Sequence, residues 1–396
     1  MNKLTLKDLD LNGKKVLMRV DFNVPLDDAG VIVDDARIRA ALPSIHYILD
    51  QGGSVILMSH LGNPKGKMDS LSLGCVAKRL STLLGKEVQM APDVVGIEVE
   101  KRVVSLKKGD VLLLENLRFY EAEKKPEKDP SFAKVLSTYG EIYVNDAFGT
   151  MHRKHSSTYT ITKYFPSAAA AGLLVEKEIK ALSQLIEKPK RPFYAIMGGG
   201  KVSSKLGVIK ELLKKVDKLF LGGGMVYTFY KAQNIPIGKS LIEEDMIEET
   251  RKILEEGKDK LIFPNDLIIA DNFSNLANRK TVEAIKGIPD NWQGMDVGEK
   301  TLISWEQELK DASTIFWNGP LGVFEFSNFS NGTNQLAEYL SSLQATTIIG
   351  GGDSLAAINA LGIGKMFTHL STGGGASLEY IENGYLPAID VLTDKN

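Results

Sequence analysis

Short apolar runs alternate with longer amphipathic stretches along the whole chain. The runs typical of buried parallel strands cover 15–20, 54–58, 110–114 and 141–144, and then 193–197, 218–221, 314–317, 346–349 and 366–370. Between them, apolar positions recur with helical spacing over 72–84, 205–215, 243–256 and 333–343. This alternation predicts parallel sheets with helices on both faces. We therefore expect an α/β protein with two doubly wound, Rossmann-like parallel-sheet domains, joined by a hinge helix and separated by a cleft.

One stretch divides the pattern into two halves. Residues 168–188 form a single long helical pattern followed by Pro189 and Pro192, and proline stops a helix and stiffens its exit. A chain of 396 residues is also long for one hydrophobic core. The alternative for 168–188 is one more crossover helix within a sheet. The domains we expect are 1–167, an interdomain helix and hinge over 168–190, and 191–384.

The composition is that of an ordinary globular protein, with 43% hydrophobic and 25% charged residues and a formal net charge of −2. This charge balance offers no general attraction to nucleic acid or to anionic membranes. The longest apolar stretch, 168–175, is far shorter than the roughly 20 residues of a membrane-spanning helix, and the first residues lack a secretory pattern. The single Cys75 excludes an internal disulfide. We expect a cytoplasmic protein that binds neither nucleic acid nor membrane.

In the first half, the positions after each predicted strand are polar or cationic. Ligands of doubly wound sheets bind at the carboxyl ends of strands, so these positions are the ones that indicate function. The segments 21–23, 60–64, 115–118 and 145–149 follow strands, and Arg37, His152, Arg153 and His155 lie in nearby loops. For any single arginine, a surface ion pair is the simpler role. Several arginines at one sheet edge favour a site for a phosphate or carboxylate, because guanidinium groups bind such oxygens in pairs.

In the second half, the corresponding positions are glycine-rich. They are 198–201, 222–224, 318–320, 350–353 and 373–375. Glycine lets the backbone approach a phosphate closely and turn its N–H groups inward, and we expect each run to open a helix whose amino end favours an anion. One run alone would fit an ordinary tight turn, but so many on one sheet predict a polyphosphate or nucleotide surface.

Three charged residues stand beside these glycine runs. Lys201 and Lys205 are four positions apart, and we expect them on one face of the helix that follows Gly200. A cation at a helix amino end is unfavourable unless an anion is bound. Asp353 could hold Mg²⁺ together with substrate phosphates, or it could simply cap the amino end of its helix.

Several alternative enzyme classes lack their motifs here. The one GK-Ser match, Gly238-Lys239-Ser240, has Gln233 where a P-loop requires its first glycine. No glycine fingerprint of a dehydrogenase follows the first strand, and no paired-cysteine metal spacing or nucleophile elbow is present.

Several long motifs resemble those of the phosphoglycerate kinase family along nearly the whole chain. Among them are Asp21-Phe22-Asn23-Val24-Pro25, Ser59-His60-Leu61-Gly62, Glu115-Asn116-Leu117-Arg118-Phe119 and Trp317-Asn318-Gly319-Pro320-Leu321-Gly322. The segments 35–39, 145–157, 198–205, 350–354 and 371–377 are similar as well. The resemblance implies an amino-terminal domain for 3-phosphoglycerate or 1,3-bisphosphoglycerate and a carboxyl-terminal domain for Mg-ADP or Mg-ATP. It also implies that the tail, 385–396, returns to the first domain and that the protein acts as a monomer.

The resemblance also assigns roles to individual residues. For the phosphoglycerate it implies Asp21, Asn23, Arg37, His60, Asn63, Arg118 and Arg153. For the nucleotide it implies Gly199, Lys201, Lys205, Gly222, Gly294, Asn318, Pro320, Glu325, Gly351, Gly352, Asp353 and Ser354, with Glu325 near the ribose and Asp353 on Mg²⁺. For the phosphoryl group in transfer it implies Arg37, Lys201, Gly373 and Gly374.

One position departs from the family pattern. The family usually carries arginine after His60-Leu61-Gly62, and this chain has Asn63, which can donate a hydrogen bond but supplies no charge. Lys65 or Lys67 could compensate in part. We expect weaker affinity for the phosphoglycerate, with the chemistry retained.

Phosphoryl transfer by this family needs positioning and charge neutralisation more than a general base. That requirement matches a site of cations and amides, and it implies that two half-sites on different sheets close together and exclude water. Two other readings remain: a different nucleotide enzyme such as a dehydrogenase, and a non-catalytic two-domain protein that binds an anion or nucleotide. The grouping of Lys201, Lys205, Glu325 and Asp353 favours an enzyme.

Overall fold

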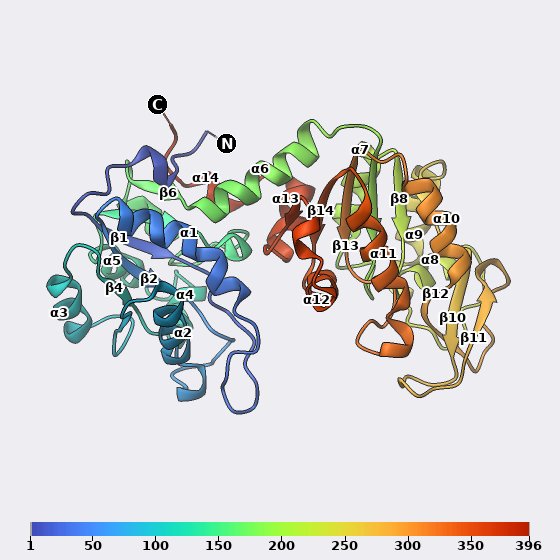
Figure 1. Ribbon diagram of the computed structural model, residues 1–396, viewed down its shortest axis with the longest axis horizontal. Coiled ribbons are helices and arrows are strands. Elements are labelled where there is room, and N and C mark those ends of the chain that lie inside the picture. Colours follow the sequence, from blue (N-terminus) through green and yellow to red (C-terminus); the bar gives the residue numbers. More distant parts are fainter. Residues whose placement is uncertain (1, 396) are drawn as a thin grey trace. The chain divides into compact units, whose positions relative to one another are not determined.

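The computed structural model describes residues 2–395, and the chain divides into two compact units (Figure 1). Unit 1 comprises Met1–Lys180 and Tyr385–Asn396, and unit 2 comprises Ala181–Gly384. None of the helices within 2–395 combines the length and the apolar composition that crossing a bilayer requires.

Unit 1 is built on a six-stranded sheet in the order β3-β4-β2-β1-β5-β6, and every strand pair is parallel. Its strands are β1 (Lys15–Arg19), β2 (Ser54–Met58), β3 (Gln89–Met90), β4 (Val111–Leu113), β5 (Ile142–Asn145) and β6 (Ala169–Ala171). The helices are α1 (Ala36–Asp50), α2 (Gly74–Leu84), α3 (Ile97–Ser105), α4 (Glu121–Lys124), α5 (Ser131–Ser137) and α14 (Pro387–Asp390). Strand β2 is buried at every position, as expected for a parallel strand covered on both faces.

Unit 2 repeats this plan with the order β15-β14-β13-β7-β8-β9, again entirely parallel. Its strands are β7 (Phe193–Met197), β8 (Lys218–Leu221), β9 (Leu261–Ile262), β13 (Thr314–Asn318), β14 (Thr346–Gly350) and β15 (His369–Leu370). The helices are α7 (Leu206–Lys215), α8 (Val226–Ala232), α9 (Ile247–Glu256), α10 (Glu299–Leu309), α11 (Asn331–Ser342), α12 (Gly352–Leu361) and α13 (Gly375–Asn383). Two parallel-sheet α/β units were predicted, and the prediction is confirmed.

A second, antiparallel sheet in unit 2 was not predicted. It consists of β10 (Asp266–Ala270), β11 (Arg279–Glu283) and β12 (Gln293–Val297), in the order β11-β10-β12 (Figure 1). Strand β11 is mostly exposed and carries charged side chains, so it lacks the apolar run that identified the other strands.

The expectation of one long helix over 168–188 is wrong at its amino end. Ala169–Ala171 form strand β6, which pairs with β5, and helix α6 spans only Leu173–Glu187. Three consecutive alanines fit a helix by propensity. Here they are buried and pair with β5 at the sheet edge, and this tertiary context overrides their propensity. Buried Asp146 accepts hydrogen bonds from the backbone N–H groups of Leu174 and Val175, at 2.9 and 3.2 Å, and so caps the start of α6.

The tail packs on unit 1. The Ala388 N–H donates to the Met151 carbonyl at 3.0 Å, and the Thr393 N–H donates to the Ala169 carbonyl at 2.9 Å. Leu386 and Ala388 are fully buried. The described part of the tail therefore belongs to unit 1.

Candidate functional site

Each parallel sheet has a central pair of strands whose outgoing connections run in opposite directions, and ligands of doubly wound folds bind at such a point. In unit 1 this pair is β1 and β5, and in unit 2 it is β7 and β13. Predicted site residues follow the strands at both points: Asp21 and Asn23 follow β1, while Gly199 and Gly319 follow β7 and β13.

Asp21, Asn23 and Arg37 lie together in unit 1. Arg37 Nη1 donates to Asp21 Oδ2, and 38% of the arginine side chain remains exposed. Asn23 Oδ1 accepts a hydrogen bond from the Gly62 N–H at 2.7 Å. The loop after β1 is thereby tied to the loop after β2 through a residue that was predicted to bind substrate.

Arg118 extends this group. It is 8% exposed, and its Nη1 donates to the Gly62 carbonyl at 2.6 Å. Burial, together with the neighbouring guanidinium groups of Arg19 and Arg153, lowers the pKa of Arg118 to about 10. Arg19 and Arg153 thus disfavour the charge of Arg118, and a bound anion would favour it.

His60 is buried and uncharged in this site. Its Nδ1 lies 3.2 Å from Arg19 Nη2. Burial, followed by the charges of Arg19 and Arg118, holds the pKa of His60 well below its usual value. The positive charge of the site at neutral pH therefore comes from arginine and lysine.

Two buried charges beneath the site were missed from the sequence. Arg19, 1% exposed, donates from Nε to Ser157 Oγ at 2.8 Å, and Glu123, fully buried, accepts from the same hydroxyl at 2.7 Å. Arg19 Nη2 lies 3.9 Å from the Glu123 carboxylate. Arg19 is the last residue of an apolar strand, and a charge that turns inward at a strand end leaves no pattern in the sequence.

The remaining unit 1 residues lie nearer the surface. Arg153 is exposed, and its Nε contacts His152 Nε2 at 3.0 Å. Burial, together with the charge of Arg153, lowers the pKa of His152 to about 4. Asn63 is exposed, and its Oδ1 accepts a hydrogen bond from Lys124 Nζ at 2.9 Å.

In unit 2 the glycine loops pack directly on one another. The Gly199 N–H donates to the Pro320 carbonyl at 2.9 Å, and the Gly223 N–H donates to the Leu321 carbonyl at 3.0 Å. Gly223 has a φ of +68°, and a Cβ there would lie 2.4 Å from Gly199 N. Several of the glycines that were predicted to bind the nucleotide, Gly222 among them, are therefore needed first because the loops pack closely there.

Lys205 and Asn318 form a buried pair at the base of these loops. Lys205 Nζ donates to Asn318 Oδ1 and lies 3.2 Å from the Asn318 carbonyl. Burial lowers the pKa of Lys205 to about 8, against the effect of Asp353. The Asn318 Nδ2 group is buried without a hydrogen-bond partner among residues 2–395. A buried cation beside an unpaired donor is suited to a phosphate oxygen.

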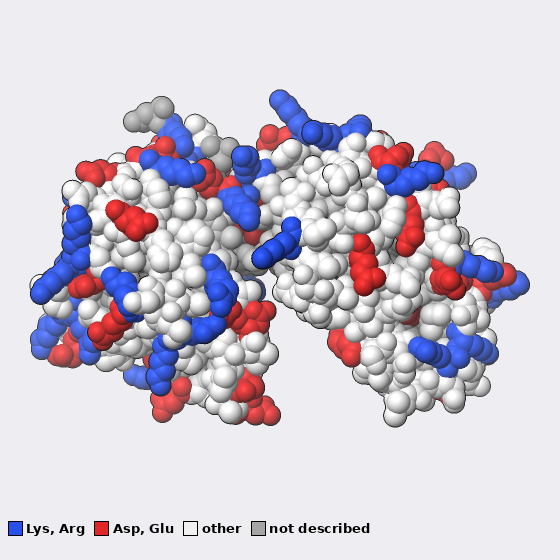
Figure 2. All heavy atoms as spheres, viewed as in Figure 1, with Lys and Arg blue, Asp and Glu red and all other residues white. Residues whose placement is uncertain are grey.

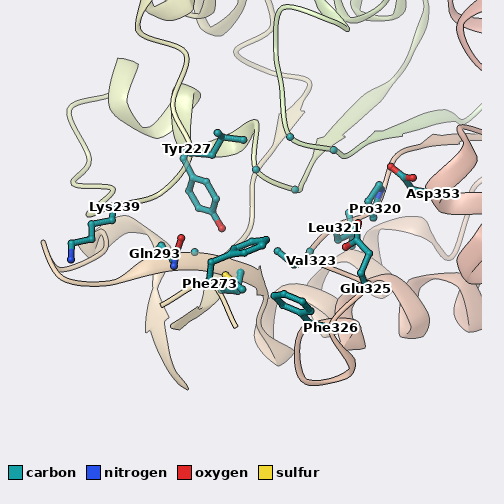
Figure 3. A pocket seen from close by; sticks show the side chains of 18 residues that line it. Tyr227, Lys239, Phe273, Gln293, Pro320, Leu321, Val323, Glu325, Phe326 and Asp353 are labelled. Atoms are coloured by element: carbon teal, nitrogen blue, oxygen red, sulfur yellow. The ribbon is translucent and has the colours of Figure 1, made fainter. Parts of the chain in front are cut away.

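A pocket of about 710 Å³ opens beside the loops (Figure 3). Its lining includes the predicted residues Gly199, Gly294, Pro320, Glu325 and Asp353. Tyr227, Phe273 and Phe326 line it as well and were missed. The Phe273 and Phe326 rings lie 5.1 Å apart, and Phe273 is 64% exposed. Aromatic and aliphatic walls beside glycine loops can hold the base of a nucleotide. The sequence signal was weak, because isolated aromatics are usually core residues.

The predicted helix positions of the charged residues need correction. Helix α7 begins at Leu206, so Lys201 precedes the helix and Lys205 is its N-cap. Lys201 is exposed while Lys205 is buried, so the two do not share a helix face. Only three of the five glycine runs lead directly into a helix, because residues 201–205 separate one run from α7 and no helix directly follows Pro320. Asp353 does not cap α12, whose N-cap is Gly351 with a φ of +92°.

The last group of predicted residues follows strands β14 and β15. Asp353 is exposed and, with Glu325, is one of two carboxylates in the pocket lining. Ser354 is buried, and its Oγ accepts from the Gly319 N–H at 2.8 Å, so it supports a loop. The Gly373 N–H already donates to Ser371 Oγ at 3.3 Å, whereas Gly374, the N-cap of α13, and Gly352 have no atoms within 4 Å of where a Cβ would stand.

Within residues 2–395, no group of three or more His, Cys, Asp or Glu side chains is placed to bind a metal ion. A magnesium ion that binds with a nucleotide needs only one or two protein carboxylates, since phosphates and water complete its coordination. The exposed Asp353 beside the glycine loops fits that requirement.

Two parallel α/β units, with cations after the strands of one sheet and glycine loops after those of the other, fit a two-domain enzyme that transfers phosphoryl groups. The phosphoglycerate kinase family model matches residues 6–384, and the chain belongs to that family. It is a phosphotransferase family. The "Phosphoglycerate kinase" of Nostoc punctiforme and the "Phosphoglycerate kinase, cytosolic" of Triticum aestivum are each 51% identical over 396 residues, with 98% of both chains covered.

Solved structures of the family have the same fold. The phosphoglycerate kinase of Coxiella burnetii has a TM-score of 0.86 at 38% identity, and that of Pyrococcus horikoshii OT3 has a TM-score of 0.87 at 31% identity. Each comparison covers 98% of both chains. The predicted family and its kinase activity are confirmed.

Proposed function

We propose that this protein transfers a phosphoryl group reversibly between 1,3-bisphosphoglycerate and ADP, giving 3-phosphoglycerate and ATP. The observation that carries the assignment of substrate to unit 1 is the group of cations after its strands, where Arg118 is held on the Gly62 carbonyl. Arg37 lies on Asp21 in the same group and stays partly exposed. Asp21, Asn23, Arg37, His60 and Asn63 complete the proposed phosphoglycerate site. A small, doubly anionic substrate would neutralise the arginines through paired hydrogen bonds.

The nucleotide is assigned to unit 2. The base and ribose occupy the pocket between Tyr227, Phe273 and Glu325, and the phosphates extend over the glycine loops toward Lys205 and Asn318. Asp353 would hold Mg²⁺, which supplies charge neutralisation between the phosphates when bound. The backbone amides of Gly351, Gly352 and Gly374 stand at helix amino ends, where an anion is favoured.

The chemistry follows from these positions. A terminal phosphate oxygen of ADP forms a new O–P bond to the acyl phosphate. The bond between that phosphorus and the acyl oxygen breaks, and the stable carboxylate of 3-phosphoglycerate leaves. No proton is transferred, so no general base is required. Arg37, Lys201 and the amides at Gly373 and Gly374 neutralise the group in transfer, and Lys205 and Asn318 orient the nucleotide.

The two half-sites belong to separate units, so transfer requires that they come together and exclude water. We assign the hinge to α6 and its proline-bounded exit. The protein is proposed to work as a cytoplasmic monomer on small molecules.

A coupled assay tests this function. Purified protein receives 3-phosphoglycerate and Mg-ATP, and an NADH-dependent dehydrogenase reports the acyl phosphate formed. We expect turnover that disappears when Mg²⁺ is chelated and returns when it is restored. A folded protein that binds Mg-ATP without turnover at saturating 3-phosphoglycerate would refute the proposed substrate and favour a non-catalytic nucleotide-binding protein.

A further inference from the structure

Lys124 lies against the residue that departs from the family pattern. It ends helix α4, is half-buried, and donates from Nζ to Asn63 Oδ1 at 2.9 Å. A lysine ammonium has donors only, so the Asn63 amide must present its oxygen to Lys124. The Asn63 amide NH₂ group then points away from the lysine and stays available to an anion. Lys124 keeps two further N–H donors.

This pair lies beside the phosphoglycerate site. Asn63 follows Gly62, whose carbonyl accepts from Arg118 and whose N–H donates to Asn23. Lys124 follows Glu123, which lies under the site beside Arg19. Both ends of the contact are therefore held by backbone next to the proposed substrate residues.

Two other lysines in this region are paired with carboxylates. Lys67 Nζ lies 3.5 Å from the Asp93 carboxylate, and Lys125 Nζ lies 2.9 Å from the Glu121 carboxylate. Among the residues described, the Lys124 ammonium forms no ion pair with a carboxylate. Its charge is thus uncompensated at the rim of a site that already gathers arginines.

We propose that Lys124 is a substrate-binding residue that supplies the positive charge missing at position 63, and that Asn63 orients it toward the phosphate or carboxylate of the phosphoglycerate. The inference rests on the proposed function and names Lys124, rather than the ion-paired Lys67, as the compensating cation. An arginine would supply both a hydrogen-bond donor and a positive charge. Here the Asn63 amide supplies the donor and the Lys124 ammonium supplies the charge.

The test compares Lys124→Ala with Lys125→Ala, a matched control whose lysine is exposed and paired with Glu121. Kinetics are measured at low ionic strength, and the Kd of 3-phosphoglycerate is measured by titration calorimetry. Lys124→Ala is expected to raise both KM and Kd for 3-phosphoglycerate about five- to twentyfold, while kcat, KM for ATP and Tm stay within error. Lys125→Ala should leave every value unchanged. Added salt should shrink the difference, because it screens an exposed charge.

The double variant Asn63→Arg, Lys124→Ala separates charge from structure. If Lys124 acts through its charge, a guanidinium at position 63 restores most of the lost affinity. An active wild type whose Lys124→Ala variant keeps KM and Kd within twofold refutes the role of Lys124 and leaves the proposed function intact.

A wild type that binds 3-phosphoglycerate without turnover refutes the kinase assignment, and the Kd values still decide the role of Lys124. A wild type that neither turns over nor binds 3-phosphoglycerate refutes both.

Discussion

At the scale of single residues, the cationic site of unit 1 rests on groups whose charge is set by burial. His60 and His155 are buried beside arginines, and burial lowers the pKa of His155 to about 3. Proton uptake by these imidazoles would place further positive charge beside Arg19 and Arg118. The folded protein therefore keeps them neutral, and the arginines carry the charge that an anion would meet.

This arrangement predicts a loss of stability in mild acid. The pKa of His155 in the folded protein lies below the ordinary value of about 6.5, so below pH 6.5 the unfolded chain binds a proton that the folded protein does not. We expect stability to fall between pH 6.5 and about 3, by up to about 1.4 kcal/mol per pH unit from this histidine. Urea unfolding at several pH values measures the slope, and His155→Asn should reduce it. An unchanged slope in the variant would contradict the assignment.

Lys201 carries a second prediction at this scale. It is exposed before α7, free to reach a transferring group, whereas Lys205 is buried on Asn318. We expect Lys201→Ala to lower kcat by about 10²-fold with a smaller change in KM, as for other donors directed at developing charge. The control is Lys210→Ala, because Lys210 lies in α7 and forms an ion pair with Glu249. A loss of tenfold or less would mean that Lys201 assists binding only.

At the scale of elements, the glycine runs have two separate roles. Gly223 adopts a positive φ and lies where a side chain would meet the Gly199 backbone, while Gly352 lies at the start of α12 with open space around it. The sequence shows both as glycine after a strand. Only the packing separates a glycine that closes a loop from one that leaves room for a ligand.

Alanine substitutions at these two positions should differ in sign. Gly223→Ala forces a Cβ to 2.4 Å from Gly199 N at a φ of +68°, so we expect a loss of about 2 kcal/mol or more. Gly352→Ala meets no atom within 4 Å and adds a helix-forming residue, so stability should be unchanged or rise by up to about 1 kcal/mol. Thermal and urea unfolding measure both. Equal losses of stability in the two variants would contradict the idea that the space around each glycine decides the effect of a side chain.

The parallel strands could be predicted because burial on both faces leaves continuous apolar runs, as in Ser54–Met58 and Phe193–Met197. The antiparallel sheet could not, because exposed β11 is polar, and neither could β6, whose alanines favour a helix by propensity. The cations and glycines of the site were visible as strand-end residues. The residues beneath and around the site were not visible. Arg19, Glu123 and Tyr227 have the sequence pattern of ordinary core or surface residues, and only tertiary contacts bring them to the site.

At the scale of the whole molecule, the two parallel sheets carry different chemical groups after their strands. Unit 1 presents guanidinium groups and unit 2 presents glycine loops, a buried lysine and an aromatic-lined pocket. Charged side chains of both signs are interspersed over the face shown in Figure 2, consistent with the net charge of −2. The positive charge that matters is therefore local to the strand ends.

The central claim is that each unit binds its own substrate, and one kinetic comparison tests it most directly. Arg118→Ala and Lys205→Ala are assayed beside the wild type with 3-phosphoglycerate and Mg-ATP varied in turn. The account predicts that Arg118→Ala raises KM for 3-phosphoglycerate about tenfold or more and leaves KM for ATP near the wild-type value, because a lost charged hydrogen bond costs about 1.5–3 kcal/mol. Lys205→Ala should show the reverse. Equal effects of either variant on both substrates, or a wild type without turnover, would contradict the division of the site between the two sheets.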